Sequence, residues 1–146
     1  MQKIIFGSDH GGYHLKEKIK KFLNKKGDYE ILDVGCDSED SCDYPIFGGN
    51  VADAVVNTPG SFGVVFCGSG VGISMAANKV PGARAVLANS VEIAQLGREH
   101  NGANILAMGE RTRFYDPPEK IVETFLSTPV DESERHQRRR EILNAM

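Results

Sequence analysis

The sequence is poor in several features that would indicate specialised classes of protein. It has no tryptophan, only three cysteines and a formal net charge of -3 over 146 residues. No apolar run approaches the roughly 20 residues that a membrane-spanning helix needs, and the first residues lack the apolar core of a secretory signal. The weak charge imbalance gives no reason to expect nucleic acid or a membrane surface as a partner. We therefore expect a cytoplasmic protein.

The three cysteines, Cys36, Cys42 and Cys67, cannot all pair within one chain, and none lies in a C-x-x-C spacing. Reduced thiols are therefore expected rather than a disulfide framework or a zinc site. We interpret Cys36 and Cys42 as loop or packing thiols, because free cysteine commonly behaves as a small hydrophobic residue. Cys67 differs from them, since it ends an apolar run that breaks into glycines.

What the chain does contain is an alternation of strand and helix patterns. A length of 146 residues suits a single domain over 1–146. Short connections between alternating elements favour a parallel sheet covered on both faces. We therefore predict a three-layer α/β/α sandwich with a five-stranded parallel sheet, doubly wound and Rossmann-like. The expected strands are 3–7, 30–35, 62–66, 84–88 and 103–109. A charged helix is expected at about 131–146, starting at Asp131 or Ser133.

The segment after the third expected strand is the strongest candidate site. The apolar run stops at Cys67 and opens into Gly68, Ser69, Gly70, Val71 and Gly72 before a helical pattern begins. Glycines let the backbone approach a ligand, and a helix start offers unpaired N–H groups and a positive dipole end, which also favours a thiolate. The spacing matches neither the dinucleotide fingerprint nor a Walker loop. A turn without a ligand and a buried thiol are the structural alternatives.

Asp9 and His10 follow the first expected strand. Ligands of doubly wound sheets bind outside the carboxyl ends of the strands, near a switch in strand order. We therefore expect Asp9 and His10 at the same edge as the glycine turn; the alternative is a helix cap followed by a surface histidine. His14 lies one turn beyond His10, but no further cluster of ligands supports a zinc site.

Two further groups of polar residues lie in the second half of the chain. His100 and Asn101 end the fourth expected helix, where a histidine also interacts favourably with the negative end of the dipole. Arg135 and Arg139 are four residues apart and share a helix face. A solvated basic face is the simpler interpretation, whereas two guanidinium groups beside an active site make a phosphate clamp.

Several of these stretches carry a resemblance to a known family. They are GSDHG at 7–11, DYP at 43–45, CGSGVGISMAANK at 67–79, residues 95–101, and RHQ at 135–137. With them the chain closely resembles the type B ribose-5-phosphate isomerases over nearly its whole length. The resemblance implies the same sandwich fold and no metal or organic cofactor. It also implies a homodimer, or a dimer of such dimers, with active sites shared between subunits and the C-terminal helix at the dimer interface.

The resemblance also implies a role for each matching residue. Cys67 is expected to move a proton between C1 and C2 of the open-chain sugar, and His100 to open the furanose ring with Asp9 beside the ring oxygen. Ser69 stands where many members have threonine and keeps the hydroxyl that shuttles protons between O1 and O2. The remaining roles are as follows: the backbone of Gly68, Ser69, Gly70, Val71 and Gly72 stabilises the enediolate, Tyr44 and Asn101 position the sugar, and His10, Arg111, Arg135 and Arg139 hold the phosphate.

The expected function is the interconversion of D-ribose 5-phosphate and D-ribulose 5-phosphate through a cis-enediolate, a step of the pentose phosphate pathway. Two alternatives remain open at this point. The first is isomerisation of a six-carbon sugar phosphate, allose 6-phosphate or galactose 6-phosphate, which pocket depth would distinguish. The second is a non-catalytic protein that binds a sugar phosphate or nucleotide, which would bind without turnover.

Overall fold

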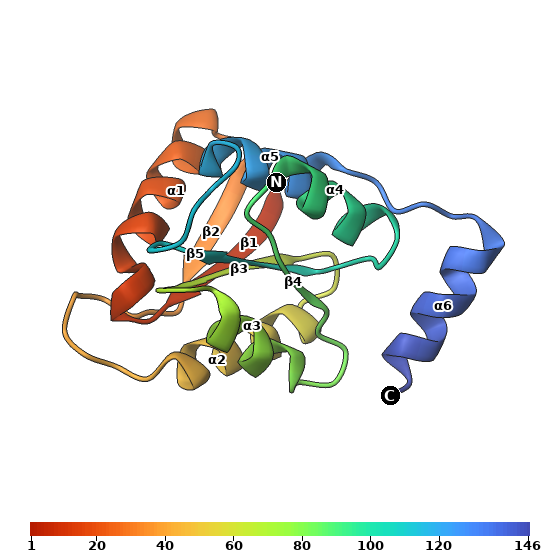
Figure 1. The fold of residues 1–146 in the computed structure, drawn as a ribbon, viewed down its shortest axis with the longest axis horizontal. Coiled ribbons are helices and arrows are strands. Elements are labelled where there is room, and N and C mark those ends of the chain that lie inside the picture. The colour runs from red at the N-terminus through yellow and green to blue at the C-terminus, as the bar shows by residue number, and fades with distance from the viewer.

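Five short apolar strands form one parallel sheet at the centre of the structure, a computed structural model that describes residues 1–146 (Figure 1). Along the sheet they lie in the order β2-β1-β3-β5-β4. The strands are β1 (Gln2–Ser8), β2 (Tyr29–Asp33), β3 (Phe62–Cys67), β4 (Ala85–Leu87) and β5 (Ile105–Gly109).

Helices cover both faces of this sheet. α2 and α3 lie on one face, and α1, α4 and α5 lie on the other (Figure 1). The helices are the short 3-10 turn η1 (His10–Gly12), α1 (Tyr13–Lys26), α2 (Tyr44–Val56), α3 (Val71–Asn78), α4 (Val91–Glu99), α5 (Pro118–Ser127) and α6 (Glu134–Asn144). This architecture confirms the predicted three-layer, doubly wound sandwich. None of the helices combines the length and the apolar character needed to cross a membrane.

The three inner strands, β1, β3 and β5, are apolar on both sides because each side packs on helices. In β1, Ile4 and Phe6 belong to the core under α1, α4 and α5, whereas Ile5 belongs to the core under α2 and α3. All three side chains are fully buried. This period of two continues in β3, where Val65 and Cys67 share the α2 and α3 side. Cys67 is therefore fixed at the end of a buried strand.

The chain changes direction along the sheet between β1 and β3. β1 pairs with β2 on one side and with β3 on the other, so the first crossover runs from β1 to β2 in one direction and the next returns from β2 past β1 to β3. The carboxyl ends of β1 and β3 therefore form a topological switch point, where a crevice opens in sheets of this kind. Asp9 follows β1 and Gly68 follows β3, which places both at this crevice.

The C-terminal helix begins at the second of its two predicted starts. The sequence predicted a helix from Asp131 or Ser133 to Met146, and α6 spans Glu134–Asn144 with Ser133 as its N-cap. The Asp131 carboxylate accepts the N–H of Ser133 at 2.8 Å, and this local turn delays the start of the helix. α6 stands apart from the sandwich (Figure 1), and His136 is its only buried residue.

Candidate active site

A cavity of about 410 Å³ opens at the switch point between β1 and β3. It brings together the two segments that the sequence predicted at this edge. We call it the Cys67 cavity; its lining residues are Asp9, His10, Gly11, Tyr44, Cys67, Gly68, Ser69, Val71, Gly72 and Arg111. Nine of these are predicted site residues, and Gly11 is the addition. Gly70, also predicted, is buried in the same turn.

The glycine turn is shaped by contacts that only glycine permits. Gly70 adopts a φ of 77°, in the left-handed region, and a Cβ there would lie 2.6 Å from Leu87 Cδ1. Its N–H donates to Cys67 Sγ at 3.0 Å, and the N–H of Val71 donates to Ser69 Oγ at 3.1 Å. The turn therefore holds both the sulfur and the hydroxyl through its own backbone.

These bonds divide the amide groups of the turn into two sets. Those of Gly70 and Val71 are occupied by Cys67 and Ser69. Those of Gly68 and Ser69 donate to no acceptor within the chain. The second set is therefore available to a ligand, beside the start of α3, where the helix dipole is positive.

Asp9 and His10 are held against the same turn. The N–H of Asp9 donates to the carbonyl of Phe66 at 3.2 Å, and its carboxylate accepts the N–H of Gly12 at 3.1 Å. The ring of His10 contacts the backbone of Cys42 at 3.2 Å through Nδ1. One histidine nitrogen is thus engaged by the chain while the residue lines the cavity.

Two further side chains close the cavity from the sides. The Arg111 side chain lies beside Gly68, where a Cβ would be 3.6 Å from its Cδ. The ring of Tyr44 packs on Gly72 so closely that a Cβ there would be 2.6 Å from Cε1. Both side chains are exposed, so each can contact a ligand.

Only one of the three free cysteines lines this cavity. Burial and a hydrogen bond to the Cys36 thiol raise the pKa of Cys42 to about 11, so Cys42 remains a protonated thiol at neutral pH. Cys36 is buried and donates to the carbonyl of Ser38 at 3.0 Å. These environments support the interpretation of Cys36 and Cys42 as packing thiols.

A second pocket, of about 210 Å³, lies where the end of α4 meets α6. We call it the His100 pocket; it is lined by His100, Asn101, His136, Arg139, Arg140 and Leu143. The rings of His100 and His136 stack at 4.4 Å with an angle of 8° between their planes. Arg140 donates to the carbonyl of His100 at 3.2 Å and to that of Asp131 at 2.9 Å, which joins α6 to α4.

The remaining predicted arginine lies beside this pocket rather than in it. Arg135 is exposed on α6 and does not line the pocket, whereas Arg139 does. Burial, together with the charge of a protonated His100, lowers the pKa of His136 below its ordinary value, although the Asp131 carboxylate at 3.6 Å opposes this. The buried Nε2 of His136 has no hydrogen-bond partner.

The Cys67 cavity and the His100 pocket lie at opposite edges of the sheet. Cys67 pairs with Gly109 at the carboxyl end of β5, whereas Gly63, at the start of β3, donates to the carbonyl of Asn104. His100 precedes Asn104 and caps α4, so it belongs to the amino edge. One chain therefore divides the predicted site residues into two groups that do not meet.

The sequence analysis missed two residues that organise these pockets. The Glu110 carboxylate accepts the N–H of Leu15 at 2.7 Å, which caps α1 from the segment that carries Arg111. His136 appeared only within the RHQ stretch at 135–137, and its stack on His100 has no sequence signal because it joins the ends of two distant helices. No group of three or more His, Cys, Asp or Glu side chains is arranged to hold a metal ion.

Fold and site define a doubly wound α/β protein with a polar cavity, a thiol and a glycine turn at its switch point. The model of the Ribose/Galactose Isomerase family matches residues 4–143. The chain belongs to this family.

Individual relatives agree with this assignment. Ribose-5-phosphate isomerase B of Mycobacterium tuberculosis (strain H37Rv) is 44% identical over 144 residues, which cover 97% of this chain and 87% of that protein. The Escherichia coli protein of the same name is 42% identical over 146 residues, covering 100% and 97%. The structure of Clostridium thermocellum ribose-5-phosphate isomerase B matches with a TM-score of 0.93 and 47% identity, over 99% of this chain and 96% of that one.

Proposed function

We propose that the protein is an aldose–ketose isomerase that interconverts D-ribose 5-phosphate and D-ribulose 5-phosphate, a step of the pentose phosphate pathway. The observation that carries the proposal is the Cys67 cavity, whose lining residues supply a thiol, a hydroxyl and two backbone amides without an acceptor in the chain. Relatives at 42% and 44% identity over nearly the whole chain are ribose-5-phosphate isomerases.

Cys67 is the proposed base of the isomerisation. Its thiolate removes the proton from C2 of the open-chain aldose, and the electron pair moves to O1 to give a cis-enediolate. The free amides of Gly68 and Ser69 stabilise the negative charge, which develops only during the reaction. The Ser69 hydroxyl transfers a proton between O2 and O1, and Cys67 returns its proton to C1. These steps account for every proton without a cofactor.

His100 is the proposed acid and base of ring opening. It donates a proton to the ring oxygen and then takes up the proton that the anomeric hydroxyl loses, with Asp9 beside these atoms. Because His100 and Cys67 lie at opposite edges of the sheet, a complete site needs a second copy of the chain. We propose a homodimer, alone or as half of a dimer of dimers, in which the His100 pocket of one subunit faces the Cys67 cavity of the other.

The outer surface of α6 supports this assembly. Three apolar residues near its end, Ile142, Leu143 and Met146, are 61%, 45% and 91% exposed. An isolated helix shorter than about 12 residues is marginal in water, so α6 needs a packing partner. A second subunit would cover these side chains and place α6 at the interface.

Phosphate binding is assigned to four basic residues. His10 and Arg111 come from the Cys67 cavity, and Arg135 and Arg139 come from α6 of the other subunit. Asn101 and Tyr44 position the sugar. The three free cysteines fit a reducing compartment, and we propose that the enzyme acts in the cytoplasm.

A turnover assay tests the function. Purified protein treated with EDTA is incubated with ribose 5-phosphate, allose 6-phosphate and galactose 6-phosphate, and ketose formation is measured. We expect metal-independent activity on ribose 5-phosphate. Activity confined to a hexose phosphate would move the substrate to the six-carbon class, and binding without turnover would indicate a non-catalytic protein.

A further inference from the structure

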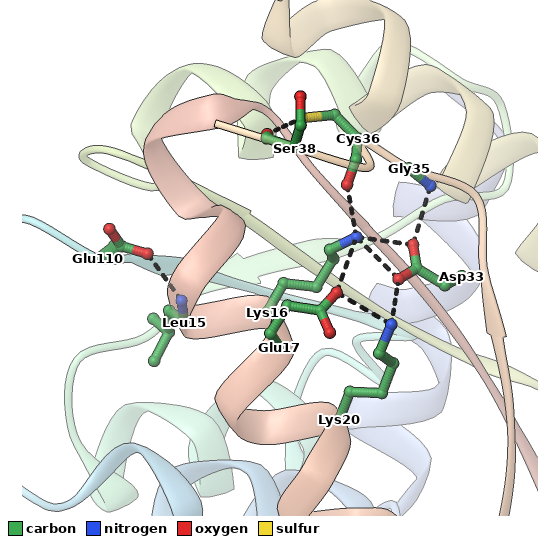
Figure 2. A network of polar contacts seen from close by, with 9 residues as sticks. All are labelled: Leu15, Lys16, Glu17, Lys20, Asp33, Gly35, Cys36, Ser38 and Glu110. Carbon is green, nitrogen blue, oxygen red and sulfur yellow. Dashed lines mark hydrogen bonds and ion pairs between the residues drawn. The ribbon is translucent and has the colours of Figure 1, made fainter. Parts of the chain in front are cut away.

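Lys16 on α1 has no exposed side-chain surface, and the proposed reaction does not use it. Its ammonium group donates to both carboxylate oxygens of Asp33, at 2.9 and 2.8 Å, and to the carbonyl of Cys36, at 2.7 Å (Figure 2). Three acceptors match the three donors of an ammonium group. Lys16 is therefore fully engaged and is not free to act as a nucleophile or base.

The acceptors of Lys16 lie at the base of residues 34–43, which join β2 to α2 and are called here the 34–43 segment. The N–H of Gly35 donates to the same Asp33 carboxylate at 2.9 Å. The backbones of Gly35 and Cys36 also pair with Ser8, at 2.6 and 2.7 Å. Ser8 ends β1 and precedes Asp9, so the network fixes the segment beside the Cys67 cavity.

Three side chains of η1 and α1 contact the 34–43 segment at successive points. They are Lys16 at the carbonyl of Cys36, His14 at the Glu39 carboxylate (2.9 Å) and His10 at the backbone of Cys42 (3.2 Å). Lys16 makes the only buried contact of the three. Lys16 therefore fixes the segment near its start, at Cys36, and Cys42 near the end of the segment contacts the His10 ring.

The contact at Cys42 leaves the other nitrogen of His10 for a ligand. Nδ1 lies 3.2 Å from both the nitrogen and the carbonyl oxygen of Cys42, so the chain engages it in either tautomer. The position of Nε2 in the cavity then depends on the position of the Cys42 backbone.

We propose that Lys16 is a positioning residue for phosphate binding: by fixing the 34–43 segment, it holds the His10 ring where that ring binds the phosphate. The inference rests on the proposed function, in which His10 contacts the phosphate of the sugar. It adds a residue that lies outside the cavity and touches no substrate.

Lys20 provides a matched control one turn further along α1. Its ammonium group donates to the same Asp33 carboxylate at 2.7 Å and to Glu17 at 3.0 Å, but it makes no hydrogen bond to the 34–43 segment (Figure 2). The hydrogen bonds of Lys16 and Lys20, together with that of Gly35, outweigh burial and lower the pKa of Asp33. Replacing Lys20 removes an ion pair from the network but leaves the bond to Cys36.

The test compares Lys16→Met with Lys20→Met. The Kd of inorganic phosphate is measured by calorimetry, and KM and kcat are measured with ribose 5-phosphate. For Lys16→Met we expect Kd and KM to rise about tenfold while kcat changes less than about threefold, since ground-state binding is lost. Lys20→Met should stay within about twofold of the wild type. An unchanged phosphate Kd in folded Lys16→Met, or equal changes in both variants, would overturn the proposal.

A double-mutant cycle tests whether Lys16 acts through His10. In a His10→Ala background, Lys16→Met should change the phosphate Kd by less than about twofold, because the ring it positions is gone. If the two substitutions raise the phosphate Kd by independent factors that multiply, Lys16 does not act through His10. Hydrogen exchange of residues 36–42 gives a readout without any ligand: it should be faster in Lys16→Met and unchanged in Lys20→Met.

Removal of one partner of a buried ion pair can prevent folding. The variant Lys16→Met/Asp33→Asn avoids this by removing the charge from both partners, and the same rise in phosphate Kd is expected for it. If the wild-type protein binds phosphate but does not isomerise ribose 5-phosphate, the proposed function fails. The phosphate Kd of the lysine variants still decides the role of Lys16 in that case.

Discussion

The Cys67 cavity is built from strand ends and glycine backbone, whereas the His100 pocket is built from helix ends and long side chains. In the cavity, the reactive groups are held by bonds such as Gly70 N–H to Cys67 Sγ at 3.0 Å. At the pocket, α6 is attached to the sandwich by Arg140, by Asn144, whose side-chain oxygen accepts from Arg84 at 2.8 Å, and by a single buried residue, His136. The first region rests on the core of the sandwich, whereas the second adjoins a helix whose apolar end is exposed.

This difference suggests a division of labour within one fold. Proton transfer at carbon needs a base and amides fixed to a fraction of an ångström, which a buried sheet edge provides. In the proposed mechanism, ring opening and phosphate binding use longer side chains, which a neighbouring subunit would supply. The predictions below test whether the two regions differ in this way.

Removal of the base should have the largest effect. Cys67→Ala is expected to lower kcat by about 10³-fold or more, because general base catalysis contributes up to about 10⁴-fold. Binding of ribose 5-phosphate, measured by calorimetry, should remain within a few-fold of the wild type. Cys42→Ala is the matched control and should keep its activity; unchanged turnover in Cys67→Ala would remove the thiol from the mechanism.

Mixing two inactive variants should restore activity if the regions meet across subunits. Cys67→Ala and His100→Ala each lack one catalytic group, but a mixed dimer contains one site with both groups intact. Unfolding and refolding of an equal mixture should recover about a quarter of the wild-type activity, because half of the dimers are mixed and each has one working site. If the mixture recovers no activity, the Cys67 and His100 of one active site do not come from different subunits, and the shared site is contradicted.

Loss of one phosphate ligand from each region should have a moderate effect. Arg111→Ala in the cavity and Arg135→Ala on α6 are each expected to raise KM about tenfold and to change kcat less, since the phosphate is bound in the ground state. Arg138 pairs with Glu134 at 2.9 Å, and Arg138→Ala serves as the control on α6. An equal fall in kcat and kcat/KM would show that the arginine acts in the transition state instead.

Mild acid should loosen the two regions in different pH ranges. The pKa of His136 is lowered, so its contribution to stability is present above its ordinary pKa of about 6.5 and is lost as pH falls through the lower folded value. The pKa of Asp33 is also lowered, so its contribution persists down to about pH 4 and is lost below. When pH falls from 7 to 5, the protection of backbone amides from hydrogen exchange should therefore decrease in α6 but not in the 34–43 segment. In His136→Phe, the protection of α6 should no longer decrease between pH 7 and pH 5.

The sequence carried most of the information about the Cys67 cavity. The alternation of strand and helix predicted the sheet, and the rule that ligands bind at strand ends placed Asp9 and Cys67 at one edge. Both placements are confirmed by the pairing of β1 with β3 and by the cavity between them. The residue roles rest on the family resemblance and stay predictions.

The sequence was less informative where distant side chains make the structure. Nothing in the sequence around Lys16 distinguished it from the exposed lysines of α1. Its partner, Asp33, lies 17 residues away at the end of β2. The stack of His100 on His136 joins two helices separated by β5 and α5. The sequence left two possible starts for the last helix, and the local turn at Asp131 leaves Ser133 as its N-cap.

The Cys67 turn also has features that the sequence predicts and features that it does not. The sequence by itself determined that an apolar strand would end in a thiol and a flexible glycine turn, because these features depend on local composition and spacing. Only the tertiary structure decided which amides of the turn are occupied and which are free, and that His100 lies at the opposite edge of the sheet. The first outcome depends on the backbone conformation of the turn, in which Gly70 has a φ of 77°, and the second on how crossovers place distant segments. Residue types and spacing fix neither of them.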